Sequence, residues 1–89
     1  MKKQDLLDLG FKPTCKGFHY LHEAVQLTIN NPLIRMGTIY NKLAEKYNET
    51  YKLIERAIRH CIKSSYSELN CESNSSAISQ LAIMFSEEE

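Results

Sequence analysis

Eighty-nine residues suffice for one domain with a modest core, because a chain of this size buries only about 60–65% of the surface that its unfolded form exposes. Hydrophobic residues at 43% and charged residues at 25% are typical of a globular protein, and no apolar run approaches the ~20 residues of a membrane span. The net charge of zero gives no overall attraction to charged partners. The amino terminus carries Asp5 and Asp8 after its lysines, so it is not a signal peptide, and we expect a single cytoplasmic domain over residues 1–89.

The hydrophobic pattern predicts an all-α fold, a compact bundle of about five helices. A short helix is expected ahead of Gly10, followed by a break at Pro13 and Gly17. Apolar residues at helical spacing then predict helices over residues 18–29, 38–47, 51–65 and 77–85. Thr38 is a candidate amino cap for the second of these. The polar residues 67–76 are expected to form a loop.

Residues 38–65 have the pattern of a helix-turn-helix, in which about three residues join two helices. Ala44 is small where the first helix would cross the second, and Asn48 tolerates the left-handed backbone of a sharp turn. The turn lacks glycine, however, and Glu49 occupies a position that is usually apolar. Apolar contacts between the two helices are expected from Leu43, Tyr47, Ile54 and Ala57. From spacing alone, DNA binding and a plain helical hairpin remain alternatives.

Charge is divided along the chain. All eleven lysines and arginines lie at or before Lys63, and with six acidic residues up to Ser67 this part carries +5. Five glutamates from Glu68 onward give −5, three of them in an acidic tail at residues 86–89. Such asymmetry indicates either a polyanionic partner or a solvated surface with an acidic end.

The helix predicted at residues 51–65 concentrates positive charge on one side. At 100° per residue, four cations share a stripe about 60° wide: Lys52, Arg56, Arg59 and Lys63. Like charges at i,i+4 cost a few tenths of a kcal/mol, so a stripe of one sign favours contact with phosphates. Glu55 and His60 flank the stripe. Arginine can grip guanine and glutamate can accept from cytosine in the major groove, so Glu55 beside Arg56 favours contacts with bases.

Two motifs in register carry a family resemblance. The first matches at Tyr40, Ala44, Lys46, Asn48, Thr50 and the whole block from Glu55 to His60. The second matches upstream at Gly10, Lys16, Gly17, Tyr20, Leu21, Glu23 and Ala24. With these residues the chain resembles, over nearly its whole length, the C-terminal effector domain of stage 0 sporulation protein A, the sporulation response-regulator family.

The resemblance implies a sequence-specific, double-stranded DNA-binding transcriptional regulator of the nucleoid. Its recognition helix, about residues 51–65, would enter the major groove at promoter boxes. Base contacts are expected from Glu55 and Arg56 by resemblance and from Lys52 by its place in the stripe. Phosphate contacts are expected from Arg59, His60, Lys63 and Lys16. Lys16 and Gly17 would begin a helix whose amino end faces phosphate. Binding as a homodimer or in tandem is left open.

Departures from the family pattern limit these expectations. The receiver domain that controls the full regulator is expected to be absent, and a deletion after the recognition helix removes the segment that contacts RNA polymerase. Leu53 replaces a common arginine, so the target DNA sequence is expected to differ. The alternative function is a protein-interaction module, derived from the effector domain, that binds a regulator or another partner without DNA.

Neither catalysis nor a bound metal or cofactor is expected. His19 and His22 are spaced i,i+3, but no third ligand lies nearby in the sequence. Cys61 follows His60 on a helix, where neighbours point about 100° apart, so Cys61 faces the predicted core. Three cysteines without C-x-x-C spacing, Cys15, Cys61 and Cys71, are expected to be free thiols.

Overall fold

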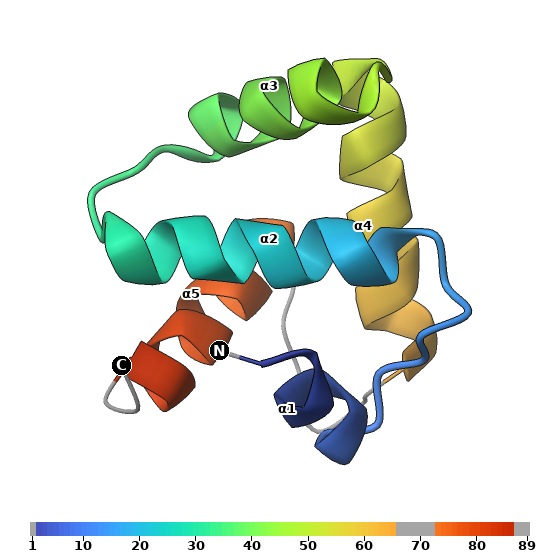
Figure 1. Ribbon diagram of the computed structural model, residues 1–89, viewed down its shortest axis with the longest axis vertical. Helices are drawn as coiled ribbons and strands as arrows, with labels where there is room; N and C mark the ends of the chain where they lie inside the picture. The colour runs from blue at the N-terminus through green and yellow to red at the C-terminus, as the bar shows by residue number, and fades with distance from the viewer. Residues whose placement is uncertain (1, 66–72, 87–89) are drawn as a thin grey trace.

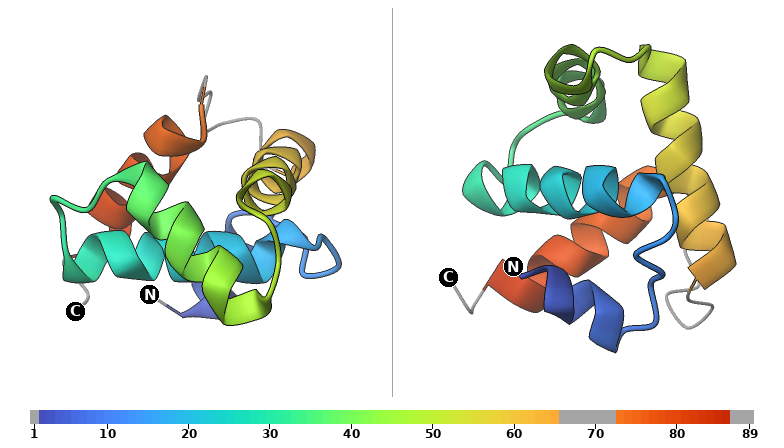
Figure 2. Two further views of the ribbon diagram at one scale, coloured as in Figure 1. Left: turned by 90° about the horizontal axis from the view of Figure 1, so that it is seen from above. Right: turned by 45° about the vertical axis from the view of Figure 1, so that its right-hand side comes forward.

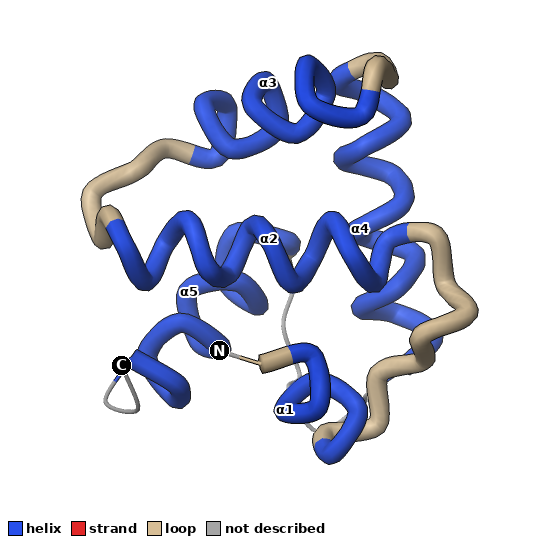
Figure 3. The backbone as a smooth tube through the Cα atoms, viewed as in Figure 1, coloured by secondary structure: helices blue, strands red, loops and turns tan. Residues whose placement is uncertain are grey.

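The computed structural model describes residues 2–65 and 73–86, and within these ranges it contains five α-helices and no strand (Figures 1 and 3). The helices are α1 (Lys3–Asp8), α2 (Gly17–Asn30), α3 (Met36–Tyr47), α4 (Tyr51–Ser65) and α5 (Asn74–Ser86). The prediction of an all-α bundle of about five helices is therefore confirmed. None of the helices in the described ranges has the length and apolar character needed to cross a bilayer.

Two predicted helix starts were wrong. Helix α3 begins at Met36 rather than after Thr38. The Met36 side chain packs against the core, and this contact favours a helix that starts two residues earlier. Helix α5 begins inside the predicted loop, because the Ser73 hydroxyl accepts the backbone N–H of Ser76 at 3.2 Å and so caps the first turn. Residues 67–72 of that loop, with Cys71, lie outside the described residues, as do the three terminal glutamates.

Helix α2 is central and packs against α3, α4 and α5. Figure 1 shows α3 running along one side of α2 and α4 standing across its amino-terminal end, and the turned views of Figure 2 show the same crossing. This position requires apolar residues on more than one side of α2. Its buried side chains are Phe18, Tyr20, Leu21, Ala24 and Val25.

The amino end of α2 lies directly on the backbone of α4. A Cβ atom added at Gly17 would be 2.0 Å from the carbonyl oxygen of Ala57 and 2.9 Å from the backbone nitrogen of Ile58. Only glycine therefore fits at this crossing. Gly17 is buried against the backbone of α4 at Ala57 and Ile58.

A polar contact joins α2 to α3. The ammonium of Lys46 donates to Oε1 of Glu23, and the Lys46 ammonium also lies 5.6 Å from the centre of the Tyr47 ring. Burial alone would raise the pKa of Glu23, but the bond from Lys46, with the Tyr47 hydroxyl and the nearby charges, outweighs it, so the pKa falls below its ordinary 4.5. Glu23 is therefore ionised at neutral pH.

Replacing Gly17 with alanine is expected to destabilise the fold by about 1–3 kcal/mol or more, because the new methyl group would overlap rigid backbone rather than a movable side chain. Urea denaturation gives the free energy of unfolding. The matched control is Gly37→Ala on α3, where the nearest atom to the added Cβ is the Tyr51 hydroxyl at 4.0 Å. That change is expected to stabilise by about 0.5–1 kcal/mol. Equal effects of the two changes would contradict the close crossing.

The Glu23–Lys46 contact predicts a loss of stability in acid. Because the pKa of Glu23 is lower in the folded state, its contribution is present above 4.5 and is lost as the pH falls through the lowered folded value. Thermal unfolding of the wild type and of Glu23→Gln should therefore differ at neutral pH and converge in acid. A difference that persists unchanged in acid would mean that the ionised carboxylate contributes nothing.

Candidate nucleic-acid interface

The turn between α3 and α4 is built from Asn48, Glu49 and Thr50. Asn48 has a φ of 54°, in the left-handed region, which confirms the conformation predicted for it. The Glu49 N–H then donates to the Ala44 carbonyl at 2.9 Å, which ends α3. The Thr50 hydroxyl accepts the N–H of Leu53 at 3.1 Å and caps α4. Three residues therefore stop one helix and start the next.

Glu49 stands in the turn at a position that is usually apolar, and it forms an ion pair there. Its carboxylate lies 3.7 Å from the Lys16 ammonium just ahead of α2, so the unexpected acidic residue forms an ion pair with another part of the chain. This pair ties the turn to the amino end of α2, close to the Gly17 crossing. Because the Lys16 side chain stays 60% exposed, its charge still reaches solvent.

Tyr47 makes a contact that the sequence did not indicate. Leu43 and Ile54 are buried in the shared core as expected. Tyr47, the last residue of α3, packs edge-on against Tyr20 of α2, with ring centres 5.0 Å apart. Its ring therefore also joins α3 to α2.

Helix α4 buries one side and exposes the other. Its core-facing residues are Ile54, Ile58, Cys61 and Ile62. Its exposed residues include all four cations of the predicted stripe, Lys52, Arg56, Arg59 and Lys63, and also His60. We call these five residues the α4 basic face. Leu53 is half-buried against the core, at the edge of that face.

Most of the α4 basic face has no acidic partner. Within the described ranges, no carboxylate lies in ion-pair distance of Lys52, Arg56 or Lys63. The exception is Arg59, whose Nη1 lies 3.3 Å from Oε1 of Glu55 one turn earlier. The Arg59 side chain is 50% exposed and that of Glu55 30%, so the pair is partly solvated and is worth only about 0.3–0.5 kcal/mol. A phosphate or base could replace either partner at little cost.

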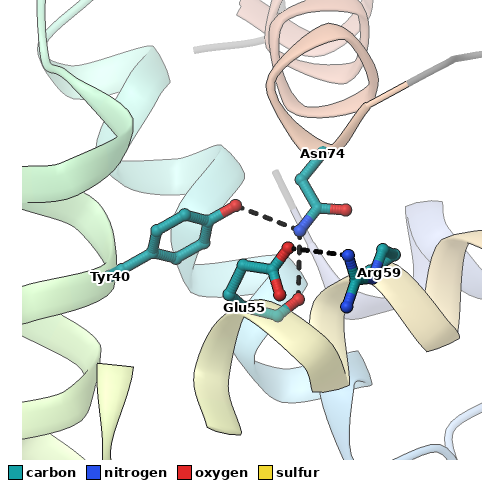
Figure 4. A network of polar contacts seen from close by, with 4 residues as sticks. All are labelled: Tyr40, Glu55, Arg59 and Asn74. Atoms are coloured by element: carbon teal, nitrogen blue, oxygen red, sulfur yellow. Dashed lines mark hydrogen bonds and ion pairs between the residues drawn. The ribbon is translucent and has the colours of Figure 1, made fainter. Parts of the chain in front are cut away.

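Beneath this ion pair, Asn74 connects three helices (Figure 4). Its side-chain amide donates to the Tyr40 hydroxyl at 3.0 Å and to the Glu55 backbone carbonyl at 3.1 Å. Asn74 is buried in the first turn of α5, Tyr40 belongs to α3 and Glu55 to α4. Burial raises the pKa of Tyr40, and the bond from Asn74 only partly offsets this, so the hydroxyl stays protonated at neutral pH. The backbone of Glu55 is therefore held in place by Asn74, while its carboxylate is left to pair with Arg59.

Sequence reasoning found the α4 basic face but missed the contacts that orient it. The polar Ser73 and Asn74 before an apolar run were a usable signal for a helix start. Nothing in the sequence indicated that the Asn74 amide would reach Tyr40 and Glu55, because these partners lie 34 and 19 residues away from it along the chain.

The cysteine and histidine neighbours on α4 lie in different environments. Cys61 is buried while its neighbour His60 is exposed, so the two side chains do not face each other. Cys15 and Cys61 carry thiols rather than a disulfide, as predicted. In the part of the chain that the structure describes, no three side chains of histidine, cysteine, aspartate or glutamate are grouped to hold a metal ion.

The chain matches a known protein family. The family model described as "Sporulation initiation factor Spo0A C terminal" matches residues 3–87, nearly the whole chain. No solved structure matched the chain.

Replacing Asn74 with alanine is expected to lower the free energy of unfolding by about 1–3 kcal/mol, because the buried Tyr40 hydroxyl loses its donor. Chemical denaturation measures the change. Ser75→Ala, an exposed change in the same helical turn, is the matched control and should stay within about 0.5 kcal/mol of the wild type.

A double-mutant cycle with Tyr40→Phe separates this contact from general damage to α5. Once the hydroxyl is gone, Asn74→Ala should cost less than it does in the wild type. Strictly additive effects would show that the hydrogen bond does not couple α5 to α3.

Proposed function

Because the chain belongs to the family of Spo0A C-terminal domains, which are DNA-binding regulatory domains rather than enzymes, we propose that it is a sequence-specific regulator of transcription that binds double-stranded DNA at promoter boxes. The observation that carries the proposal is the α4 basic face, on which four exposed cations stand along one side of a single helix. A helix is narrow enough to enter the major groove, which is about 12 Å wide. From Lys52 to Lys63 the face extends about 17 Å, which is long enough to contact both groove walls.

Base contacts are assigned to Arg56, Lys52 and Glu55. Arg56 and Lys52 are exposed and have no ion-pair partner within the described ranges, so no internal bond opposes their contact with a guanine edge. Glu55 lies between the two cations and the core, with its backbone held by Asn74. Its carboxylate would exchange Arg59 for a cytosine amino group.

Phosphate contacts are assigned to Arg59, His60, Lys63 and Lys16. The first three lie on the α4 basic face, and Lys16 lies at the amino end of α2, linked to the turn through Glu49. Lys16 would therefore meet a backbone phosphate on the side of the turn that faces the amino end of α2. Binding at the nucleoid, by two copies on tandem boxes or by a homodimer, is part of this proposal.

The alternative is a protein-interaction module. Two large apolar side chains are strongly exposed on another part of the surface, Leu33 at 91% and Ile83 at 74%. Thr28, Pro32 and Ile83 line a groove of about 330 Å³ between the end of α2 and α5. This surface would suit a protein partner, although isolated exposed apolar residues are also common on monomers.

Arg56→Ala is expected to weaken binding to the preferred DNA by about 1–3 kcal/mol, because it removes one contact to a base edge. Since Leu53 leaves the target sequence open, the duplex is first selected from a random pool. Fluorescence anisotropy then compares the selected duplex with a scrambled one. Arg35→Ala is the matched control, because Arg35 is exposed just ahead of the amino end of α3, a whole helix away from the turn. It should change the two affinities equally and slightly.

Salt dependence separates this function from the alternative. Each neutralised phosphate contributes about −0.9 to the slope of log affinity against log salt, so Lys63→Gln should reduce the slope by about that amount. If no sequence is enriched from the pool, or if Arg56→Ala keeps full preference for it, the assignment of α4 as the recognition helix is wrong.

A further inference from the structure

A second group of cations surrounds a pocket that contains no residue of α4. The pocket, of about 440 Å³, lies between α2 and α3 and is lined at its edge by α1. Its volume is within the range of sites for small molecules. Charged side chains enter it from three helices: Lys3 from α1, Glu23 from α2, and Lys42 and Lys46 from α3.

The charges in this pocket do not cancel. Lys46 is bonded to Glu23, which leaves Lys3 and Lys42. Both are exposed, and no carboxylate in the described ranges pairs with either. Two uncompensated lysines suit a dianion such as a phosphate monoester better than a single carboxylate, because a phosphate carries a charge of about −1.5 to −2 at neutral pH.

The base of the pocket is apolar. Leu43 is buried and Leu27 half-buried, and the Tyr47 ring stands beside them against Tyr20. A plain inorganic anion would leave this apolar surface in water. A ligand that also has a flat or apolar body would cover it, at about 25 cal/mol for each Å² removed from water.

Glu23 sets a further condition on the ligand. One of its oxygens bonds Lys46, and the Tyr47 hydroxyl lies close enough to the carboxylate to help lower its pKa, but no hydrogen bond of good geometry reaches the other oxygen, Oε2, which is buried. A buried carboxylate oxygen whose donor is poorly placed is unfavourable, by up to about 1–3 kcal/mol when the donor is lost altogether. A ligand with an N–H donor on its body would relieve this after a small side-chain rotation, and one without such a donor would not.

We propose that the pocket between α2 and α3 binds a small organic phosphate of nucleotide type. The phosphate lies at Lys3 and Lys42, the flat body lies on Leu27 and Leu43 beside Tyr47, and an N–H of that body faces Glu23. The site is independent of the α4 basic face, so its occupancy and the binding of DNA are separate properties.

The test is an NMR titration of the full chain with adenosine 5′-monophosphate, which has a phosphate, a flat body and an amino donor. We expect saturable shifts of the backbone amides of α2 and α3 around the pocket, with a dissociation constant of about 1 mM or tighter. Adenosine and inorganic phosphate, each with one half of the ligand, should bind at least about tenfold more weakly. Absence of saturation, or equal binding of inorganic phosphate, overturns the proposal.

Two matched variants locate the binding. Lys42→Gln should weaken the nucleotide about tenfold, since it removes one charged contact to phosphate. Lys52→Gln makes the same change on α4 and should leave nucleotide binding as it is. Equal weakening by both variants would mean general attraction to positive charge, and would overturn the assignment to this pocket.

Glu23→Gln and DNA binding complete the test. Glu23→Gln should weaken the nucleotide while inorganic phosphate binds as well as before or better, because the repelling carboxylate is gone. If both ligands respond alike, Glu23 does not contact the body of the ligand. Lys42→Gln should keep its affinity for the selected duplex; a loss comparable to that of Arg56→Ala would place the pocket in the DNA interface and contradict an independent site.

Discussion

The contact on which the rest of the structure depends is the crossing of α2 and α4 at Gly17. There the helix start lies on the Ala57 carbonyl with no room for a side chain. So close an approach fixes the depth and the rotation of α4 against the central helix. With Ile54, Ile58 and Cys61 turned to the core, the cations of α4 have only solvent to face. The exposed basic face is therefore a consequence of how α4 is buried.

Polar contacts then hold α4 at its amino end and about one turn further along. At the turn, Thr50 caps α4 and Glu49 is paired with Lys16. One turn further, Asn74 of α5 holds the Glu55 carbonyl and the Tyr40 hydroxyl (Figure 4). A hydrogen bond to a backbone carbonyl places a helix without using the side chain that the helix presents. The Glu55 carboxylate thus stays available at the surface, in a weak pair with Arg59.

A net charge of zero conceals two different arrangements of positive charge. On α4, four cations lie along one helix with a single acidic residue among them, an arrangement suited to a long, repeating polyanion. Between α2 and α3, lysines from separate helices surround an apolar floor and a carboxylate, an arrangement suited to one small ligand. The first is periodic in the sequence, since its members recur at helical spacing. The second has no such period.

Local physics explains what could be predicted. The helices, the left-handed Asn48 and the stripe of Lys52, Arg56, Arg59 and Lys63 depend on neighbours within one or two turns, so the sequence alone determined them. Other features depend on residues that are far apart in the chain or on packing in the core. They are the start of α3 at Met36, the contact of Tyr47 with Tyr20, the close crossing at Gly17 and the hydrogen bonds of Asn74. Only the tertiary structure decided these, because which distant groups meet depends on how all the helices share one core.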